Sequence, residues 1–306
     1  MHWENKGVIF SCNKKYIWSQ THTQIPTVDL IESGVFRIYY STRDSQNRSL
    51  TSYFDVSADN PAQIIYEHNK IILPLGERGT FDDCGVMPSC VINTDMGKYL
   101  YYTGWNVRNT IPYQLSLGLA VEENGCFRKF GKGPIMSRNI YEPYLCAAAY
   151  VLRKESIWHM WYTSGTGFEV VNNRVEPLYN IKYSHSVDGI HWEYRGQIAI
   201  DYNHGKECIA RPCVVFEDGL YKMWYTYRGI VDYRTDKTQS YSIGYAESEN
   251  GIDWIRMDEK IKLSNAEWDS EMQAYPYVVK HNGVKYMFYN GNGFGQTGIG
   301  YAVCNE

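Results

Sequence analysis

Four carboxylates stand at comparable positions along the chain, each shortly before a short apolar run. Asp83, Glu207 and Glu271 lie five residues before a proline, and Glu142 has a comparable place if Ala148 stands for the proline. Like charges that share a cavity raise the pKa of one acid, which then stays protonated near neutral pH. One protonated and one ionised carboxyl can act together as general acid and base. These four residues are therefore the candidate catalytic groups.

A second set of side chains suits a ligand rich in hydroxyl groups. Acids and amides hydrogen-bond pairs of hydroxyls, arginines bind anionic groups through two parallel bonds, and aromatic faces cover the apolar side of a sugar ring. The candidate binding residues are His22, Gln24, Arg43, Trp105, Asn106, Arg211, Arg228, Tyr275 and Asn290. The expected partner is a carbohydrate, bound without a cofactor and without a metal.

Each of these features also has a purely structural interpretation. A carboxylate before a strand could accept hydrogen bonds from loop amides and hold neighbouring units in register. The Trp and Tyr residues of the strand-like phrases are expected in the core, and His159 and His185, which lie within such phrases, are expected to be structural.

The elements that must position these residues come from an internal repeat. One phrase recurs as SYFDVSADN (52–60), SLGLAVEENG (116–125), NIKYSHSVDGIHW (180–192), SIGYAESENGIDW (242–254) and GIGYAVCNE (298–306). Two further phrases precede each copy: an alternating aromatic one, such as YKMWYTYRG (221–229), and a short apolar one, such as RPCVVF (211–216). Alternating and short continuous apolar runs are both typical of β-strands.

Each unit predicts four antiparallel strands, the fourth of which, at 190–193 in one copy and 252–255 in another, follows an Asp-Gly or Asn-Gly turn. Helices long enough for parallel crossovers are absent from the pattern. Five such units predict an all-β fold, a five-bladed β-propeller formed by residues 1–306 as one domain. The start of each innermost strand and the end of each second strand should then meet around one axial funnel.

The first residues of the chain explain how the ring closes. The fifth copy stops at Glu306 before any fourth strand, whereas Met1-His2-Trp3-Glu4 resembles the GIHWE phrase at 189–193. The N-terminus is therefore expected to supply the missing strand of the last blade and leave no open sheet edge at the seam. Trp3 should take the place that Trp192 and Trp254 take in their blades.

Composition excludes several partners. A net charge of -4 gives no electrostatic case for nucleic acid or an anionic membrane surface. No run of about eighteen apolar residues suggests a membrane span, and MHWENKG lacks the features of a signal peptide, which favours a cytoplasmic protein. The eight cysteines form no CxxC pair, so free buried thiols are expected rather than disulfides or a metal site. Oligomeric state is left open.

The five-bladed repeat with its Ser-x-Asp-Gly-x-x-Trp phrase at 186–192 resembles the arabinanase, invertase and levansucrase superfamily of glycoside hydrolases (families 43, 32 and 68) and the related family 130 phosphorylases. Glu142-Pro143-Tyr144 is similar to an arabinanase-like phrase and Glu207-Cys208 to an invertase-like one. The first-blade Asp-Pro of that group is here Ile25-Pro26, so the resemblance does not extend to a first-blade nucleophile.

The resemblance implies cleavage of a glycosidic bond, with inversion favoured. Glu207 is then expected to be the acid, Asp83 or Glu142 the base, and Glu271 a pKa modulator or hydroxyl ligand. Two alternatives remain: a non-catalytic carbohydrate-binding propeller, and a phosphorylase or other sugar-processing protein of intracellular polysaccharide metabolism. For phosphorolysis, Arg43, Arg211 and Arg228 could form the anion site.

Overall fold

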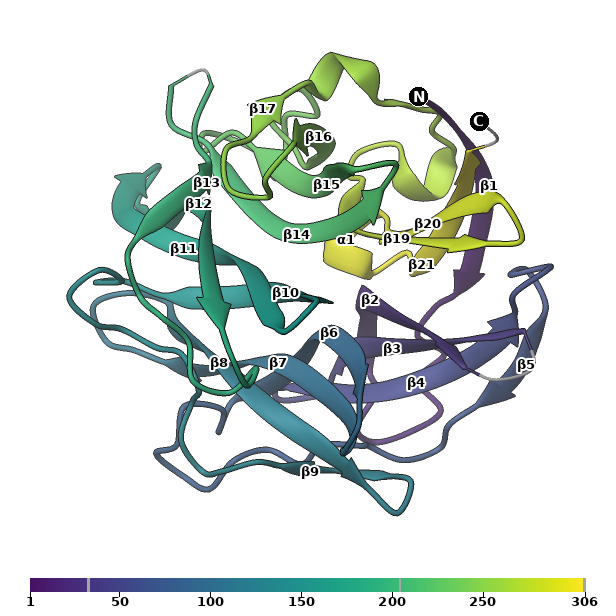
Figure 1. Ribbon diagram of the computed structural model, residues 1–306, viewed down its shortest axis with the longest axis horizontal. Coiled ribbons are helices and arrows are strands. Elements are labelled where there is room, and N and C mark those ends of the chain that lie inside the picture. Colours follow the sequence, from purple (N-terminus) through teal and green to yellow (C-terminus); the bar gives the residue numbers. More distant parts are fainter. Residues whose placement is uncertain (32–33, 204, 305–306) are drawn as a thin grey trace.

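The computed structural model describes residues 1–31, 34–203 and 205–304, which form five antiparallel sheets arranged around an axis (Figure 1). Blade one contains β2 (Thr21–Ile31), β3 (Val35–Arg43), β4 (Ser49–Ser57) and β5 (Ile64–Glu67). Blade two contains β6 (Gly85–Thr94), β7 (Gly97–Val107), β8 (Tyr113–Glu123) and β9 (Cys126–Lys129). Blade three contains β10 (Cys146–Lys154), β11 (Ile157–Val171), β12 (Arg174–Ser186) and β13 (Gln197–Ile200).

Blades four and five complete the ring. Blade four contains β14 (Cys208–Glu217), β15 (Leu220–Arg228), β16 (Ser242–Ser248) and β17 (Ile255–Arg256). Blade five contains β19 (Ala274–His281), β20 (Val284–Asn290), β21 (Ile299–Cys304) and β1 (His2–Phe10). The short elements η1 (Asp258–Lys260), β18 (Lys262–Leu263), η2 (Glu267–Asp269) and α1 (Asn292–Gly295) lie in the connections of blades four and five. The five-bladed, all-β prediction is confirmed.

The N-terminal strand closes the last blade. β1 pairs antiparallel with β21, with Glu4 opposite Val303 and Asn5 opposite Ala302, and its other edge pairs in parallel with β18. β1 therefore lies between β21 and, at His2 and Trp3, β18, and Figure 1 shows it beside β21. The sequence-based prediction of N-terminal closure is confirmed.

Tryptophans at equivalent positions pack blades three, four and five against the blade before each of them. Trp3 meets the ring of Trp224 edge to face with centroids 6.2 Å apart. Trp192 meets Tyr101 at 6.2 Å, and Trp254 meets Trp161 at 6.0 Å, in the same edge-to-face manner. Trp3 thus takes the expected place in blade five. Aromatic rings from neighbouring second strands fill the space between blades, where a large flat side chain excludes the most water.

The fourth strands of blades three and four begin later than predicted. Residues 190–193 form a tight turn rather than a strand, because Asp188 Oδ1 accepts hydrogen bonds from the amides of Ile190 and His191. Asn250 does the same for Ile252 and Asp253 in blade four. These side chains compete with a sheet ladder for the backbone donors, and the strands start only at Gln197 and Ile255.

Candidate functional site

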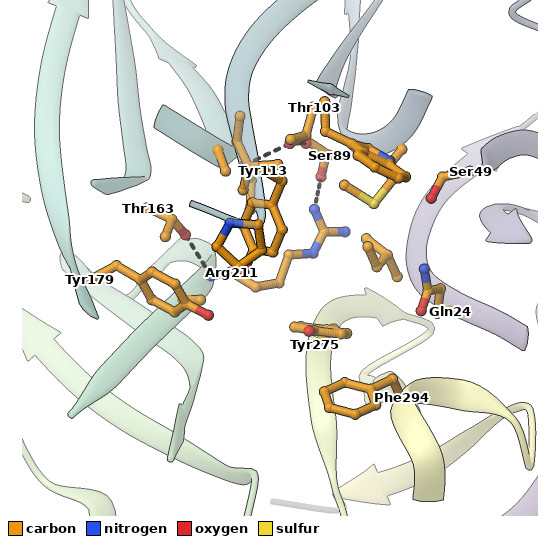
Figure 2. A pocket seen from close by; sticks show the side chains of 18 of the residues that line it. Gln24, Ser49, Ser89, Thr103, Tyr113, Thr163, Tyr179, Arg211, Tyr275 and Phe294 are labelled. Atoms are coloured by element: carbon orange, nitrogen blue, oxygen red, sulfur yellow. Dashed lines mark hydrogen bonds between the residues drawn. The ribbon is translucent and has the colours of Figure 1, made fainter. Parts of the chain in front are cut away.

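The axis of the propeller holds a cavity of about 590 Å³ on the face where the innermost strands begin. All five blades contribute, through the starts of innermost strands and the ends of second strands, as the repeat predicted. The lining residues used below are Gln24, Arg43, Asn47, Ser49, Ser89, Thr103, Trp105, Tyr113, Thr163, Tyr179, Arg211, Arg228, Tyr233, Arg234, Tyr241, Tyr275 and Phe294. In Figure 2, several of these side chains, including Ser89, Thr163 and Tyr113, surround Arg211.

A recurring backbone distortion aims residues into this cavity. Ile25, Ala148, Arg211 and Tyr275 have φ between 47° and 61°, in the left-handed region, and each lies at a break in the register of its innermost strand. Their amides no longer pair within the blade. They donate instead to the neighbouring blade, to Asn290 Oδ1, Thr103 Oγ1, Thr163 Oγ1 and Thr226 Oγ1, at 2.7–3.2 Å. Such bulges re-aim side chains at the rims of barrels and next to functional sites.

Arg211 crosses the axis and ties blades together. Its guanidinium donates to the carbonyl of Ser89 in blade two at 2.5 Å (Figure 2). It also donates to the carbonyl of Pro26 and to Oγ1 of Thr27 in blade one, both at 2.8 Å. The side chain is 1% exposed and its Nε has no hydrogen-bond partner among the described residues. Burial lowers the pKa of Arg211 from its usual range. No carboxylate of the described chain pairs with it.

Arg228 lies in a cage of tyrosines. Its guanidinium carbon is 3.6 Å from the ring centroid of Tyr233, its Nε donates to the hydroxyl of Tyr241 at 3.0 Å, and Nη1 donates to the carbonyl of Gly229. Tyr179 stands on another side of the guanidinium, with its hydroxyl 3.5 Å from Nη2. Arg228 is 2% exposed. The described ion pairs give this cation no carboxylate in direct contact either. Its immediate neighbours are dipoles and aromatic faces, and Glu176 acts on it only from beyond contact distance.

Two further arginines complete the cationic lining. Arg43 donates through Nη1 to Asn47 Oδ1 at 3.0 Å, and its other guanidinium N–H groups have no hydrogen-bond partner in the described chain. Arg234 is held by Glu176 through an ion pair of 2.5 Å. Burial would raise the pKa of Glu176, but hydrogen bonds from Arg234 and Tyr233 outweigh it and lower the pKa. Arg234 is therefore the only lining arginine whose charge a described carboxylate neutralises.

Aromatic faces form the rest of the wall. Trp105 lies over Gly85, where a Cβ atom would come within 1.8 Å of the indole nitrogen, so glycine is required for the ring to sit there. Tyr275 and Phe294 enter from blade five, and Tyr113 and Tyr179 from the opposite side (Figure 2). Burial raises the pKa of Tyr275 and Tyr179 well above the usual value, so both hydroxyls stay protonated. The wall offers flat apolar faces with hydroxyl groups at their edges.

Six of the nine residues predicted to bind the ligand line the cavity: Gln24, Arg43, Trp105, Arg211, Arg228 and Tyr275. The other three stand behind it. Asn290 receives the amide of Ile25, Asn106 donates to the carbonyl of Thr80, and His22 is buried with Nδ1 2.8 Å from Oγ1 of Thr21. Burial, and to a smaller extent the charge of Arg43, lowers the pKa of His22 to about 4.

None of the four predicted catalytic carboxylates is among the lining residues. Glu142 is fully buried within blade three, where Oε1 accepts from the Tyr162 hydroxyl at 2.8 Å and from Lys182 Nζ at 2.9 Å. Oε2 accepts from the Ser164 hydroxyl. Both oxygens of this carboxylate thus accept from donors of its own blade. Glu142 therefore has the structural role that the sequence analysis gave as an alternative to catalysis, except that its donors are side chains and not loop amides.

The other three carboxylates lie apart from one another. Glu207 pairs with Arg256 Nη1 at 2.7 Å, and Asp83 Oδ2 accepts the amide of Gly79 at 2.8 Å. Glu271 is exposed, 3.7 Å from Lys237 Nζ. The structure brings none of the four into contact with another, and the acid and base roles expected for them remain untested.

A carboxylate paired with a second-strand tyrosine recurs in blades two to five, and it accounts for Glu142 among the four predicted carboxylates. Hydroxyls of Tyr102, Tyr162, Tyr225 and Tyr289 donate to Asp82, Glu142, Asp258 and Asp269, respectively, at 2.5–3.0 Å. A lysine or arginine joins the carboxylate in blades two, three and four. These tyrosine–carboxylate pairs are sites of blade cohesion, away from the axis.

The sequence analysis did not select Tyr113, Tyr179, Tyr233, Tyr241 and Arg234, which all line the cavity. Tyr233 and Arg234 lie in the connection between β15 and β16, whose length exceeds that of the corresponding connection in blade five. That long insertion, rich in polar residues and ending at the funnel, was the available signal.

Other site classes find no support in the described residues. They contain no cluster of three or more His, Cys, Asp or Glu side chains suited to a metal ion, and Cys12, Cys84, Cys90, Cys126, Cys146, Cys208 and Cys213 are free thiols. Within the same residues, no helix has the length and apolar character needed to cross a membrane.

No family model matches the chain. Two proteins of Mycobacterium tuberculosis do: uncharacterized protein MT1551 (strain CDC 1551 / Oshkosh) is 36% identical and uncharacterized protein Rv1502 (strain ATCC 25618 / H37Rv) is 35% identical. Both alignments extend over 310 residues and cover 100% of this chain and 100% of the relative.

Several solved propellers superpose along nearly the whole chain. A complex of BT0996 with RGII has a TM-score of 0.75 at 16% identity, covering 99% of this chain and 91% of that protein. A thermostable family-43 glycoside hydrolase has a TM-score of 0.68 at 17% identity and covers 96% and 92%. A structure from the GH130 family of mannoside phosphorylases has a TM-score of 0.70 at 15% identity and covers 99% and 93%. At these identities the likeness is one of fold.

Proposed function

Because this chain belongs to the family of the mycobacterial proteins MT1551 and Rv1502, and has the five-bladed fold of the propeller glycoside hydrolases, we propose that its axial cavity binds a carbohydrate. The observation that carries the proposal is the wall of the cavity. Trp105, Tyr275 and Phe294 offer flat faces to a sugar ring, and hydroxyl, amide and guanidinium groups stand between them. The fold neighbour BT0996 was solved in complex with an RGII carbohydrate, which is consistent with a ligand of this class.

The proposal is binding, without hydrolysis by the four carboxylates singled out in the sequence. Hydrolysis of a glycosidic bond requires two carboxyls about 5–10 Å apart that flank the bond. Glu142 already accepts from three side chains, and Glu207 is neutralised by Arg256. The described lining of the cavity includes four arginines and no carboxylate. Cavity volume also favours an oligosaccharide end or a single sugar unit over a polymer, since 590 Å³ falls within the usual range for small-ligand pockets.

A panel of immobilised glycans tests this proposal. Wild-type protein should bind a subset of the panel, and Trp105→Ala should lose that binding because stacking on the indole face is removed. Phe130→Ala is the matched control, since Phe130 is a half-exposed aromatic outside the cavity. The glycans that bind are then incubated with the protein and examined for released reducing sugar. Release of sugar that Glu207→Gln or Glu142→Gln abolishes would replace binding by hydrolysis through those carboxylates.

A further inference from the structure

The charge balance of the axial cavity identifies the class of carbohydrate that it takes, an inference that rests on the proposed function. The protein carries a net charge of -4, yet the charged residues in the described lining of the cavity are all arginines: Arg43, Arg211, Arg228 and Arg234. Glu176 neutralises Arg234. The remaining three have no described carboxylate within ion-pair distance. The cavity is thus a cationic region of an acidic protein.

We propose that the ligand is an anionic carbohydrate, whose phosphate or carboxylate group binds against Arg43 in the field of Arg211 and Arg228. Burying a charge without a partner is costly, so an uncompensated cation in a cavity favours a ligand that brings the opposite charge. Arg211 is 1% exposed and Arg228 2%, and the low dielectric around them strengthens their attraction for an anion.

Arg43 is the residue that can contact the anion directly. It lies at the end of β3 on the wall of the cavity, and only its Nη1 is engaged, by Asn47. Its free N–H groups can form the two parallel bonds that a guanidinium makes with a carboxylate or phosphate. Arg211 differs, because carbonyl and hydroxyl oxygens of Ser89, Pro26 and Thr27 already occupy its two Nη atoms. Its Nε remains without a partner.

Tyr275 links the cationic side chains to the wall that would hold the sugar ring. Tyr275 lines the same cavity as Arg43 and Arg228. Its ring lies 5.9 Å from that of Tyr241, whose hydroxyl accepts a hydrogen bond from Arg228. A ring stacked on Tyr275 would therefore carry its acidic substituent between arginines of blades one and four. This predicts recognition of both parts of the ligand, the ring by aromatic faces and the anion by guanidinium groups.

The test uses matched glycans on one array: neutral oligosaccharides, the same sugars with a phosphate ester, and the corresponding uronic acids. Wild-type protein should bind anionic members and not their neutral counterparts. Preference between the phosphate and carboxylate sets identifies the source of the anion. For the best ligand, Arg43→Gln should raise Kd about tenfold or more, because a hydrogen bond to a charged group is lost. Arg43→Lys keeps the positive charge but cannot form two parallel hydrogen bonds, so its Kd should lie between those of wild type and Arg43→Gln.

The control variant is Arg195→Gln, which removes one positive charge from an exposed side chain of blade three and should leave Kd unchanged. Equal binding of neutral and anionic members, insensitive to Arg43→Gln, would overturn the anion assignment while the proposed carbohydrate binding stands. Binding of no glycan would contradict both. Conversion of a neutral oligosaccharide to sugar phosphate on addition of inorganic phosphate would also overturn the inference, because the anion would then be a co-substrate and not part of the carbohydrate.

Discussion

The buried carboxylates and the buried arginines of this propeller lie in two regions with opposite charge balance. Within the blades, Asp82 and Glu142 each meet a tyrosine hydroxyl and a lysine, so every charge has a partner. At the axis, Arg211 and Arg228 are equally buried but meet carbonyls, hydroxyls and rings. A buried charged side chain stabilises the fold when all its hydrogen-bond and ion-pair partners are present. Where an oppositely charged partner is missing, a ligand can supply it. Burial alone does not distinguish the two regions.

Glu142→Gln should have the largest effect on stability and none on the binding of ligand. The substitution leaves Lys182 buried without its anion, and loss of one partner of a buried ion pair costs about 3–5 kcal/mol. Urea unfolding monitored by tryptophan fluorescence measures the change. Affinity for the best glycan should stay at the wild-type value. A stable variant that fails to bind would show that Glu142 belongs to the functional site and would contradict the contrast between paired carboxylates in the blades and unpaired arginines at the axis.

Acid should destabilise the protein through His22, which is 7% exposed and lies near Arg43. Its folded pKa of about 4 is below the unfolded value near 6.5. The unfolded chain therefore binds a proton that the folded protein excludes, and stability falls as pH decreases from 6.5 towards 4. At pH 5 the free energy of unfolding should be about 2 kcal/mol lower than at pH 7.5 from this group alone.

His22→Asn is the matched variant, since asparagine tolerates the positive φ of 61° at this position. It should show a pH 7.5 to pH 5 difference about 2 kcal/mol smaller than wild type. Identical pH profiles for the two proteins would show that His22 titrates normally and that the axial face is less desolvated than the arginine arrangement implies.

Glu207→Gln should have a moderate effect. Arg256 loses one carboxylate but keeps Asp258 at 2.6 Å, so the guanidinium is not left unpaired. Chemical denaturation should give a loss of about 1–2 kcal/mol, the range for one hydrogen bond to a charged group. Loss of a measured sugar-releasing activity at unchanged stability would instead support the acid role expected from the sequence.

Glu271→Gln should have the smallest effect. Its side chain is 61% exposed and 3.7 Å from Lys237, which is equally exposed. Exposed pairs of this kind contribute about 0–1 kcal/mol, so thermal unfolding should hardly change. A large decrease in ligand affinity would place Glu271 in the functional site despite its distance from the cavity lining.

The fold was predictable from the sequence because the strand pattern repeats along the chain. Five copies of one strand pattern, together with the match of Trp3 to Trp192 and Trp254, determine the number of blades and the closing strand. The segments that meet at the axis were also predictable, since strand order determines them. Arg43, Arg211 and Arg228 were selected in this way.

The direction of each side chain was not predictable from spacing. Glu142 and Arg211 both stand at the entrance of an innermost strand, but Glu142 turns into its own blade towards Tyr162 and Arg211 turns across the axis. The direction of Arg211 follows from its positive φ at a break in the register of β14. No residue type in the sequence indicates that this break occurs. The tyrosines of the β15–β16 connection were missed because they lie outside the repeat.

A crystal structure of the protein with its best-binding glycan tests the central claim most directly. The account predicts a sugar ring stacked in the axial cavity on Tyr275 or Trp105, with a phosphate or carboxylate group at hydrogen-bond distance, about 2.7–2.9 Å, from the guanidinium of Arg43. A glycan bound with its glycosidic bond between two of Asp83, Glu142, Glu207 and Glu271, and with no anionic group near Arg43, would contradict it.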